Sequence, residues 1–379
     1  MIATRILGNK LHIISFSIPY PANYGGAIDV FYKIKALAKE GVKITLHCFQ
    51  YDRLPAELLE KYCDKVFYYP RKMIGAHLLG FYPFIVSSRK SKTLLTNLLT
   101  DDAPILFEGL HTCYSIGDPR LKDRLKIVRS HNLEHDYYAA LASVESNKMK
   151  RLYYNTESRK LKRFEEYAYK KADLILGISK KDTSYLQKKY KKSVLISAFH
   201  AFENVNIPNQ TKKYAFYHGN LSVGENNEAA CFLVEKVFKG LSHSLIIAGS
   251  QPSLRLKKMA TEAENVTLLD DINVDQINDL IHQAQINILP TFQSTGIKLK
   301  LLAALFNGAH CLVNSKMVEG TGVESLVEIA DSTLEFQHKI NELMEVSCHD
   351  ISIEKRNEVL DRYSNHHQLN NLMDAIFNA

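Results

Sequence analysis

Residues 295–308 read TGIKLKLLAALFNG, and apolar runs lie on either side of them, at 286–289 and 311–313. This order predicts a strand, a loop, a helix and a second strand. The hydroxyl of Thr295 can cap the helix, and Gly308 can end it in the left-handed conformation. The segment therefore has the form of a strand–helix–strand unit, the building block of parallel sheets.

Two lysines, Lys298 and Lys300, fall in the first turn of this predicted helix. Cations oppose the helix dipole at that end, so a purely structural helix favours acidic residues there. The lysines indicate that an anion such as phosphate shares the site. Because the two positions lie about 200° apart around an ideal helix, we expect Lys298, the nearer to the helix start, to serve the site. Solvated lysines on an ordinary crossover helix are the alternative interpretation.

Apolar runs alternate with helical patterns along the whole chain, which predicts an α/β fold with parallel sheets. The predicted strands are 11–16, 42–49, 66–69, 105–107, 126–129, 174–178, 194–197, 214–217, 245–248, 266–269, 286–289, 310–313 and 326–329. Residues 199–213 lack a clear period and read as a linker. We predict two doubly wound, Rossmann-like domains, 1–198 and 199–360, that face a cleft at the carboxyl ends of their strands. Residues 361–379 are predicted to form an amphipathic terminal helix.

Charge is distributed unevenly along the chain. Of 48 Lys and Arg residues, 34 lie in residues 1–200, against 19 of 41 Asp and Glu residues, so this half carries a net charge of +15 and the remainder −8. The asymmetry indicates an anionic partner for the first half. No apolar run approaches the roughly 20 residues of a membrane span, and the first ten residues lack the apolar core of a signal peptide. Six scattered cysteines predict buried free thiols in a reducing cytosol and do not support a zinc site.

Residues 295–320, which close at Glu319-Gly320, resemble the donor-nucleotide segment of GT-B fold glycosyltransferases of the GT4-like family (glycosyl transferases group 1). Two earlier strand-end loops, around Gly219 and Gly249, have the spacing expected of that family. A plain tight turn is the alternative interpretation of the Gly219 loop. The resemblance implies a second domain that binds a nucleotide-diphosphate sugar, a first domain that binds the acceptor, and a terminal helix that crosses back to the first domain. It implies these donor-binding residues: Gly219, Asn220, Gly249, Ser250, Thr295, Gly296, Lys300 and Glu319.

The chain departs from the family's pattern at the diphosphate. The family usually has an arginine directly after the first glycine and a lysine shortly afterwards, whereas this chain has Asn220 and then Asn226-Asn227. We therefore expect Lys298 to supply the missing charge and to stabilise the leaving diphosphate as a catalytic residue.

A second departure concerns the ribose. The family's pair of acids falls on Thr295 and Ala303, neither of which is acidic. Either Glu319 or Glu324 binds the ribose instead, or nucleotide affinity falls some ten- to hundredfold with the loss of a charged hydrogen bond worth about 1.5–3 kcal/mol.

The first half contains two motifs that resemble acceptor-side elements of the family. Gly25 and Gly26 follow the first strand and match a Gly-Gly loop whose backbone N–H groups can hold a phosphate. A simple turn is the alternative. Residues 129–138, RSHNLEHDYY, resemble the family's His-Asn-x-Glu-His segment, which places His131 beside the transferred sugar as a catalytic residue. A structural hydrogen-bonded loop is the alternative here.

Three further residues are weaker candidates for the same acceptor side. Glu134 and His135 are second choices within the His131 segment, and Glu108 follows the neighbouring predicted strand. A histidine–carboxylate group of this kind can also bind metal, but the spacing fits no strong zinc signature.

The resemblance implies a glycosyltransferase of hexosyltransferase type that acts on a glycan or lipid-linked acceptor, as in polysaccharide biosynthesis. It further implies retention of the anomeric configuration, with no metal or other cofactor. A nucleotide-sugar epimerase is one rival, although no convincing general acid–base set stands out. A non-catalytic relative that scaffolds polysaccharide assembly is the other, and Ala303 favours it.

Residues 148–171 form a basic segment with interleaved aromatic residues, nine basic against three acidic side chains. Anionic lipid attracts each basic group by about 1 kcal/mol near the surface. We therefore expect a cytoplasmic protein that docks peripherally on the inner membrane face through Lys148–Lys171. A solvated helix face is the alternative, and nucleic acid is not expected because no recognition fold accompanies the charge.

Overall fold

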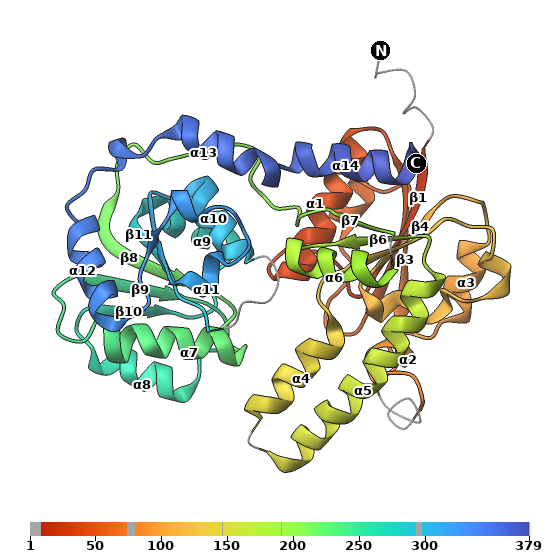
Figure 1. The fold of residues 1–379 in the computed structure, drawn as a ribbon, viewed down its shortest axis with the longest axis horizontal. Helices are drawn as coiled ribbons and strands as arrows, with labels where there is room; N and C mark the ends of the chain where they lie inside the picture. The colour runs from red at the N-terminus through yellow and green to blue at the C-terminus, as the bar shows by residue number, and fades with distance from the viewer. Residues whose placement is uncertain (1–8, 74–79, 146, 191, 293–297, 379) are drawn as a thin grey trace. The chain divides into compact units, whose positions relative to one another are not determined.

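The computed structural model describes residues 9–73, 80–145, 147–190, 192–292 and 298–378. The chain divides into two compact units. The first contains the residues up to Ala201 together with those from Asn365 onward, and the second contains Phe202–Ser364. Each unit is built around one sheet with helices beside it (Figure 1).

The first unit contains a seven-stranded sheet in the order β3-β2-β1-β4-β5-β6-β7, with parallel pairings. The strands are β1 (Lys10–Ser15), β2 (Lys43–Gln50), β3 (Lys65–Pro70), β4 (Ile105–Glu108), β5 (Lys126–Ser130), β6 (Leu174–Gly177) and β7 (Ser193–Leu195). The helices are α1 (Gly25–Lys39), η1 (Glu57–Lys61), α2 (Phe84–Ser87), α3 (Lys92–Leu98), η3 (Leu110–Ser115), η4 (Pro119–Leu121), α4 (Glu134–Val144), α5 (Lys148–Lys171) and α6 (Lys180–Tyr190). Because β1 lies inside the sheet, Ile13 is opposite both Leu46 of β2 and Leu106 of β4.

Both faces of this sheet are buried, because successive side chains of a strand point to opposite faces. Ile13 belongs to the cluster that α1 covers with Val30, Ile34 and Leu37. Ile14 belongs to the cluster on the other face, which α3 and α5 cover. The apolar face of α1 is therefore buried against this sheet.

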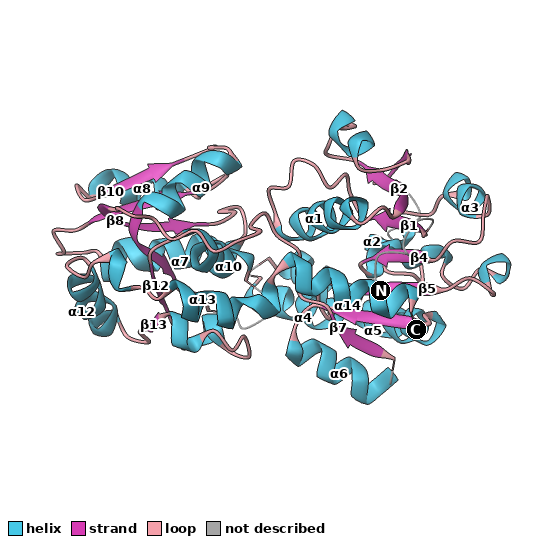
Figure 2. Cartoon of the chain, turned by 90° about the horizontal axis from the view of Figure 1, so that it is seen from above, coloured by secondary structure: helices cyan, strands magenta, loops and turns pink. Residues whose placement is uncertain are grey.

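The second unit contains a six-stranded sheet in the order β10-β9-β8-β11-β12-β13, again with parallel pairings. The strands are β8 (Lys212–His218), β9 (Ser244–Ala248), β10 (Val266–Leu269), β11 (Ala284–Leu289), β12 (His310–Val313) and β13 (Glu328–Ile329). The helices are α7 (Gly224–Phe232), η5 (Leu233–Val237), α8 (Leu254–Glu262), α9 (Val274–Gln283), α10 (Leu299–Asn307), α11 (Ser315–Val318), η6 (Glu324–Leu326), α12 (Thr333–Leu343), η7 (Cys348–Asp350), α13 (Ile353–Leu360) and η8 (Asp361–Tyr363). Figure 2 shows the strands of each sheet in magenta among cyan helices. The predicted pair of doubly wound parallel sheets is confirmed.

The terminal helix α14 (Asn365–Phe377) belongs to the first unit. Its apolar side chains Leu369, Leu372, Met373 and Ile376 join the cluster under α1. The Gln368 side chain also accepts a hydrogen bond of 2.5 Å from the backbone N–H of Ser197. The predicted return of this helix to the first domain is confirmed.

The helix predicted between Thr295 and Gly308 differs from its prediction at both ends. Helix α10 begins at Leu299, with Lys298 as its N-cap residue, so its start lies after the position predicted for the cap. Gly308 ends it with φ −116° and ψ 172°, an extended rather than a left-handed conformation. A Cβ at Gly308 would overlap the Asn287 side chain, so this glycine is required for close packing against β11 and not for a left-handed cap. Thr295 lies outside the described residues.

The cysteines and the helix lengths can also be compared with the sequence. All six cysteines are buried and free, as expected. Among the described residues, none of the helices is both long enough and apolar enough to cross a bilayer.

Candidate functional site

In the second unit, the loops after β8 and β9 pack directly on each other. The N–H of Gly219 donates to the carbonyl of Ala248 at 3.1 Å. A Cβ at Gly249 would overlap the carbonyl oxygen of Gly219, so only glycine allows this approach. A Cβ at Gly219 would in turn lie 3.1 Å from the Asn226 side chain. The two glycines predicted from sequence therefore shape one surface at the carboxyl ends of two neighbouring strands.

Asn220 and Ser250 meet on this surface. The Asn220 side-chain oxygen accepts hydrogen bonds from the Ser222 hydroxyl at 2.7 Å and from the Ser250 hydroxyl at 3.3 Å. Its backbone carbonyl accepts from the Asn226 side chain at 3.0 Å. Asn220 therefore organises the loop through hydrogen bonds.

The side chains of Lys298 and Lys300 both point at the start of α7. Lys298 Nζ lies 3.4 Å from Oε1 of Glu225, and Lys300 Nζ lies 3.1 Å from Oδ1 of the next residue, Asn226. The expectation that the two lysines would diverge is therefore wrong. That expectation assumed helical geometry at both positions, whereas Lys298 is the N-cap residue with an extended ψ of 93°. Two ammonium groups thus lie at adjacent residues of α7, where Glu225 supplies one carboxylate, so one positive charge is in excess.

Burial sets the electrostatics of this cluster. Desolvation lowers the pKa of Lys300 to about 8. The charge of Glu225 opposes this shift, whereas the charge of Lys298 adds to it. Its ammonium lies 5.0 Å from the centre of the Tyr217 ring. Desolvation, and then Lys300, lowers the pKa of His218 to about 3, and Nε2 of this histidine has no hydrogen-bond partner among the described residues. The strand end therefore holds a partly desolvated cation next to a neutral imidazole with unused hydrogen-bonding capacity.

Sequence reasoning did not identify Glu225, Tyr217 and His218 as parts of this site. The signal for His218 was available, because it ends a strand immediately before a glycine that was already a candidate. The role of Glu225 was not readable, because an acid in the first turn of a helix is ordinarily explained by the helix dipole.

Of the remaining donor-side predictions, Thr295 and Gly296 lie outside the described residues. Glu319 directly follows α11 and is exposed, and Glu324 begins η6 and is also exposed. Ala303 is buried in an apolar cluster with Phe216, Ala248 and Ile281, which gives an acidic side chain no place there without rearrangement.

In the first unit, the candidates His131 and Glu108 belong to a buried network of charges. His131 Nε2 lies 3.0 Å from Oε2 of Glu108, and Lys33 Nζ donates to the other oxygen of that carboxylate at 2.7 Å. Lys33 also bonds Asp29 at 3.0 Å, and Arg129 bonds both oxygens of Asp29 at 3.0 and 3.1 Å. Four of these side chains are fully buried, while His131 keeps an exposed fraction of 11%. The network therefore holds the imidazole in place and leaves its edge accessible.

Carboxylate and imidazole groups of Asp29, Glu108 and His131 come close enough together to ligate a cation. However, Lys33 and Arg129 already neutralise both carboxylates. A metal ion would have to displace the Lys33 ammonium from full burial, so the donor set does not favour a metal centre.

Lys33, Asp29 and Arg129 were not predicted from sequence. Asp29 and Lys33 lie four residues apart on α1, next to its apolar positions. That spacing usually indicates a solvated ion pair, and only the packing of α1 on the sheet buries it.

Glu134 and His135 start α4, directly after the His131 loop. Burial, and then Glu165, raises the pKa of Glu134 to about 8. His135 Nδ1 lies 3.2 Å from Oε2 of Glu165, and this hydrogen bond raises the pKa of His135. Glu134 therefore adjoins the His131 loop, whereas His135 is engaged with α5.

The glycines predicted as a phosphate loop begin α1. Gly25 is the first residue of the helix, and Tyr24 precedes it without a side-chain cap. A Cβ at Gly26 would overlap the ring of Phe16, the residue that follows β1. Gly26 therefore has a packing role, and the uncapped N–H groups leave an anion role open to Gly25.

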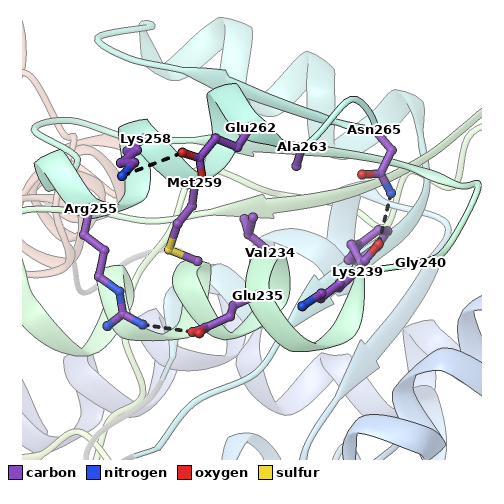
Figure 3. A pocket seen from close by; sticks show the side chains of 11 residues that line it. Val234, Glu235, Lys239, Gly240, Arg255, Lys258, Met259, Glu262, Ala263 and Asn265 are labelled. Carbon is purple, nitrogen blue, oxygen red and sulfur yellow. Dashed lines mark hydrogen bonds and ion pairs between the residues drawn. The ribbon is translucent and has the colours of Figure 1, made fainter.

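A pocket of about 540 Å³ lies between η5 and α8 of the second unit (Figure 3). Four of its charged side chains form two pairs, Arg255 with Glu235 and Lys258 with Glu262. Gly240 and Asn265, which line it, precede β9 and β10 and therefore lie toward the amino ends of those strands. Ligands of parallel α/β sheets bind at the opposite, carboxyl ends, so this pocket is not the candidate site.

The two parallel sheets and the returning helix define the GT-B fold, and solved glycosyltransferase structures superimpose on the chain. Sucrose-phosphate synthase from Thermosynechococcus elongatus matches with a TM-score of 0.70, 14% identity and coverage of 98% of each chain. Anabaena HepE, solved with UDP and glucose, matches with a TM-score of 0.65 and 11% identity over 98% of this chain and 100% of that one. S. aureus TarM, solved with UDP and saccharide ligands, matches with a TM-score of 0.64 and 11% identity over 97% and 100%.

Sequence comparison narrows the class. Residues 212–345, which contain the lysine site, match the family model described as glycosyl transferases group 1. An uncharacterized 44.6 kDa protein in the cps region of Klebsiella pneumoniae is 27% identical over 353 residues, 88% of this chain and 90% of that protein. The resemblance to the GT4-like family is thereby confirmed over residues 212–345, and the chain as a whole has the GT-B fold of its structural neighbours.

Proposed function

We propose that the protein transfers a sugar, as a hexosyltransferase, from a nucleotide-diphosphate donor to a glycan or lipid-linked acceptor. The observation that carries this proposal is the convergence of Lys298 and Lys300 on the start of α7, beside the glycine loops of β8 and β9. Excess positive charge in a partly desolvated site favours a diphosphate. The UDP-bound HepE and TarM neighbours support the same class of donor.

In this proposal the diphosphate is the leaving group. Charge that develops on it as the sugar departs is stabilised by the two lysines and by the backbone N–H groups of the loops. Because these cations belong to the chain, the transfer does not require a metal ion. Retention of the anomeric configuration remains part of the proposal on the strength of the family resemblance.

The first unit contributes His131 in this scheme. Its imidazole, positioned by the buried Glu108, binds a hydroxyl of the sugar or of the acceptor. The relative in a cps region supports capsular polysaccharide synthesis as the setting.

Thermal unfolding in the presence of a panel of UDP-, GDP- and dTDP-linked sugars tests the proposal and identifies the base. We expect one nucleotide series to stabilise the wild type and to have a much weaker effect on Lys298→Ala. Ala303 and Asn220 depart from the family's pattern, so absence of stabilisation by every compound favours a non-catalytic scaffold. Isotope exchange at a sugar carbon without an acceptor favours an epimerase instead.

We also propose that helix α5 binds an anionic membrane surface. Helices α4 and α5 pack together as a hairpin, which Figure 1 shows extending from the body of its unit. Met149 and Leu152, near the start of α5, are 83% and 68% exposed, and Lys148, Lys150 and Arg151 beside them are exposed too. Apolar side chains among cations are the pattern of a helix that lies in a headgroup region.

Vesicle co-sedimentation tests this second proposal. We expect binding to phosphatidylglycerol vesicles and none to phosphatidylcholine vesicles, with loss of binding in Leu152→Glu. Leu254→Glu, at an exposed apolar position of α8 in the other unit, is the matched control and is expected to bind as the wild type does. Equal binding by Leu152→Glu would contradict the proposal.

A further inference from the structure

Two arginines of the first unit approach one tyrosine ring. The guanidinium carbons of Arg71 and Arg89 lie 4.5 and 5.5 Å from the centre of the Tyr51 ring. Arg71 directly follows β3, Tyr51 directly follows β2, and Arg89 is held by the carbonyl of Phe16 just after β1, at 2.9 Å. The three side chains therefore lie at the carboxyl edge of this sheet.

Neither arginine forms an ion pair with a carboxylate of the described residues. Arg89 is 2% exposed and donates to the carbonyls of Phe16 and Ile85. Arg71 donates to the Ser88 hydroxyl at 3.1 Å. Burial, and then the neighbouring Arg71, lowers the pKa of Arg89 to about 9. Arg89 is buried and Arg71 is half-buried. Bringing two cations without carboxylate partners together in such a position is unfavourable unless an anion joins them.

The contrast with Arg129 in the same unit strengthens this point. Arg129 is also buried, but both oxygens of Asp29 neutralise it. Glu134 does not do the same for Arg89, because burial and Glu165 raise its pKa to about 8 and keep it largely protonated at neutral pH. Within the part of this unit that the structure describes, buried Arg89 therefore lacks the carboxylate partner that buried Arg129 has.

A buried and unused hydrogen-bonding group adjoins the arginines. Nδ1 of His111 has no partner among the described residues. Burial lowers the pKa of His111 well below its ordinary value, and the charge of Arg89 lowers it further. The His111 ring lies 5.4 Å from the ring of Phe16, whose carbonyl accepts the hydrogen bond from Arg89. The neutral ring can therefore use Nδ1 to donate to an anion.

The cluster also adjoins the accessible histidine of the proposed transfer. The Phe16 ring contacts His111 and His131, with ring centres 5.4 and 5.6 Å away. Gly109 lies between the two imidazoles, since a Cβ there would be 3.0 Å from His111 Nδ1 and 3.6 Å from His131 Cδ2. A ligand on His131 could therefore extend a neighbouring group to the arginines.

The geometry points to an oxyanion site formed by Arg71, Arg89 and His111, which takes a phosphate or carboxylate group of the acceptor. The inference rests on the proposed function, because it assigns the first unit to the acceptor. It adds that the acceptor is anionic and that its charged group binds next to the hydroxyl that receives the sugar. Planar guanidinium groups match the geometry of both oxyanions.

Anion titrations of the full chain test this site apart from the lysine site. The double variant Lys298→Ala, Lys300→Ala serves as the background, because it lacks the cations of the second unit. Thermal unfolding is followed with methyl phosphate, inorganic phosphate or glucuronate at constant ionic strength. We expect saturable stabilisation by at least one probe, weakened roughly ten- to hundredfold by Arg71→Gln through the loss of a charged hydrogen bond. Arg71→Gln is preferred because Arg89 also supports the fold.

Arg120→Gln is the matched control. Arg120 is an exposed arginine of the same unit that pairs with Asp118, and its variant is expected to respond as the background does. Stabilisation by methyl phosphate but not by glucuronate indicates that the acceptor carries a phosphate ester. Stabilisation by glucuronate but not by methyl phosphate indicates an acidic sugar. No saturable effect of any probe, or an equal effect in Arg71→Gln, overturns the inference. Nucleotide stabilisation of the single variant Arg71→Gln reports separately on the proposed donor site.

Discussion

Nε2 of His131 lies 3.0 Å from Oε2 of Glu108, a carboxylate whose other oxygen is bonded to Lys33 at 2.7 Å. The accessible imidazole is therefore attached to a charge network that solvent does not reach. This attachment separates two roles that single variants can test, one in sugar transfer and one in folding.

Glu108→Gln keeps the shape of the side chain and removes its charge. We expect kcat to fall roughly ten- to hundredfold, since a hydrogen bond to a charged group is worth about 1.5–3 kcal/mol, with little change in KM for the donor. Steady-state kinetics of Glu108→Gln, His131→Ala and the double variant provide the measurement. If Glu108 acts through His131, the double variant is no slower than His131→Ala. Unchanged kcat in Glu108→Gln would exclude the positioning role.

Lys33→Met tests the folding role of the network. The variant leaves the Glu108 carboxylate buried without its cation, which is expected to destabilise the protein by about 3–5 kcal/mol. Urea unfolding measures the loss. Lys39→Met, at the exposed end of the same helix, is the control and is expected to cost less than about 1 kcal/mol through the helix dipole. A loss in Lys33→Met no larger than that of Lys39→Met would mean that the carboxylates find other partners.

Gly249→Ala tests the packing of the two glycine loops. A Cβ there overlaps the carbonyl oxygen of Gly219, so the loop must shift and we expect a loss of about 1–3 kcal/mol. We also expect nucleotides to stabilise Gly249→Ala less than they stabilise the wild type. Gly224→Ala is a stringent control, because a Cβ at that position meets nothing within 4 Å. Comparable behaviour of the two variants in urea would contradict the packing argument.

The fold was predictable because its signals are local and repeated. Strands that are buried on both faces read as apolar runs, and the spacing of Leu369, Leu372 and Ile376 specifies the buried face of the terminal helix. Gly308 shows where such reading fails. A glycine after a helix predicts a left-handed cap, but here the missing Cβ makes room for Asn287, a contact that only the folded sheet creates.

The site was predictable in part. Histidine and glycine at strand ends indicate positions near a ligand, which is why His131, Gly219 and Gly249 were candidates. Partners contributed by other elements could not be read in the same way. Glu225 faces Lys298 across 73 positions of sequence, and Lys33 faces Glu108 across 75. The divergence expected for Lys298 and Lys300 failed because one of them is not in the helix.

Lys298→Ala and Lys300→Ala test the lysine site directly. Each is expected to lower the affinity for a nucleoside diphosphate roughly ten- to hundredfold and to leave that for the uncharged nucleoside unchanged. Lys298→Ala is expected to abolish transfer with the fold intact. Calorimetric titration gives the affinities, and Lys258→Ala, at an exposed position of α8, is the control. Normal turnover by Lys298→Ala would rule out its role in the reaction.

The pH dependence of Lys300 gives a test that needs no acceptor. Burial lowers its pKa in the folded chain to about 8, from an ordinary value of 10.5. Between these values the unfolded chain keeps a proton that the folded chain has released, so this group makes stability rise with pH from about 8 to 10.5. Below pH 8 both states are protonated and its contribution is constant.

Urea unfolding of the wild type and Lys300→Met across this range isolates the effect. We expect the stability of the wild type, relative to the variant, to increase from pH 8 to pH 10. Diphosphate binding should change in the opposite direction, because the wild-type site loses its second cation as pH rises while Lys300→Met has none to lose. Parallel stability curves for the two proteins would show that Lys300 is solvated rather than buried, and the electrostatic basis of the lysine site would then rest on Lys298 alone.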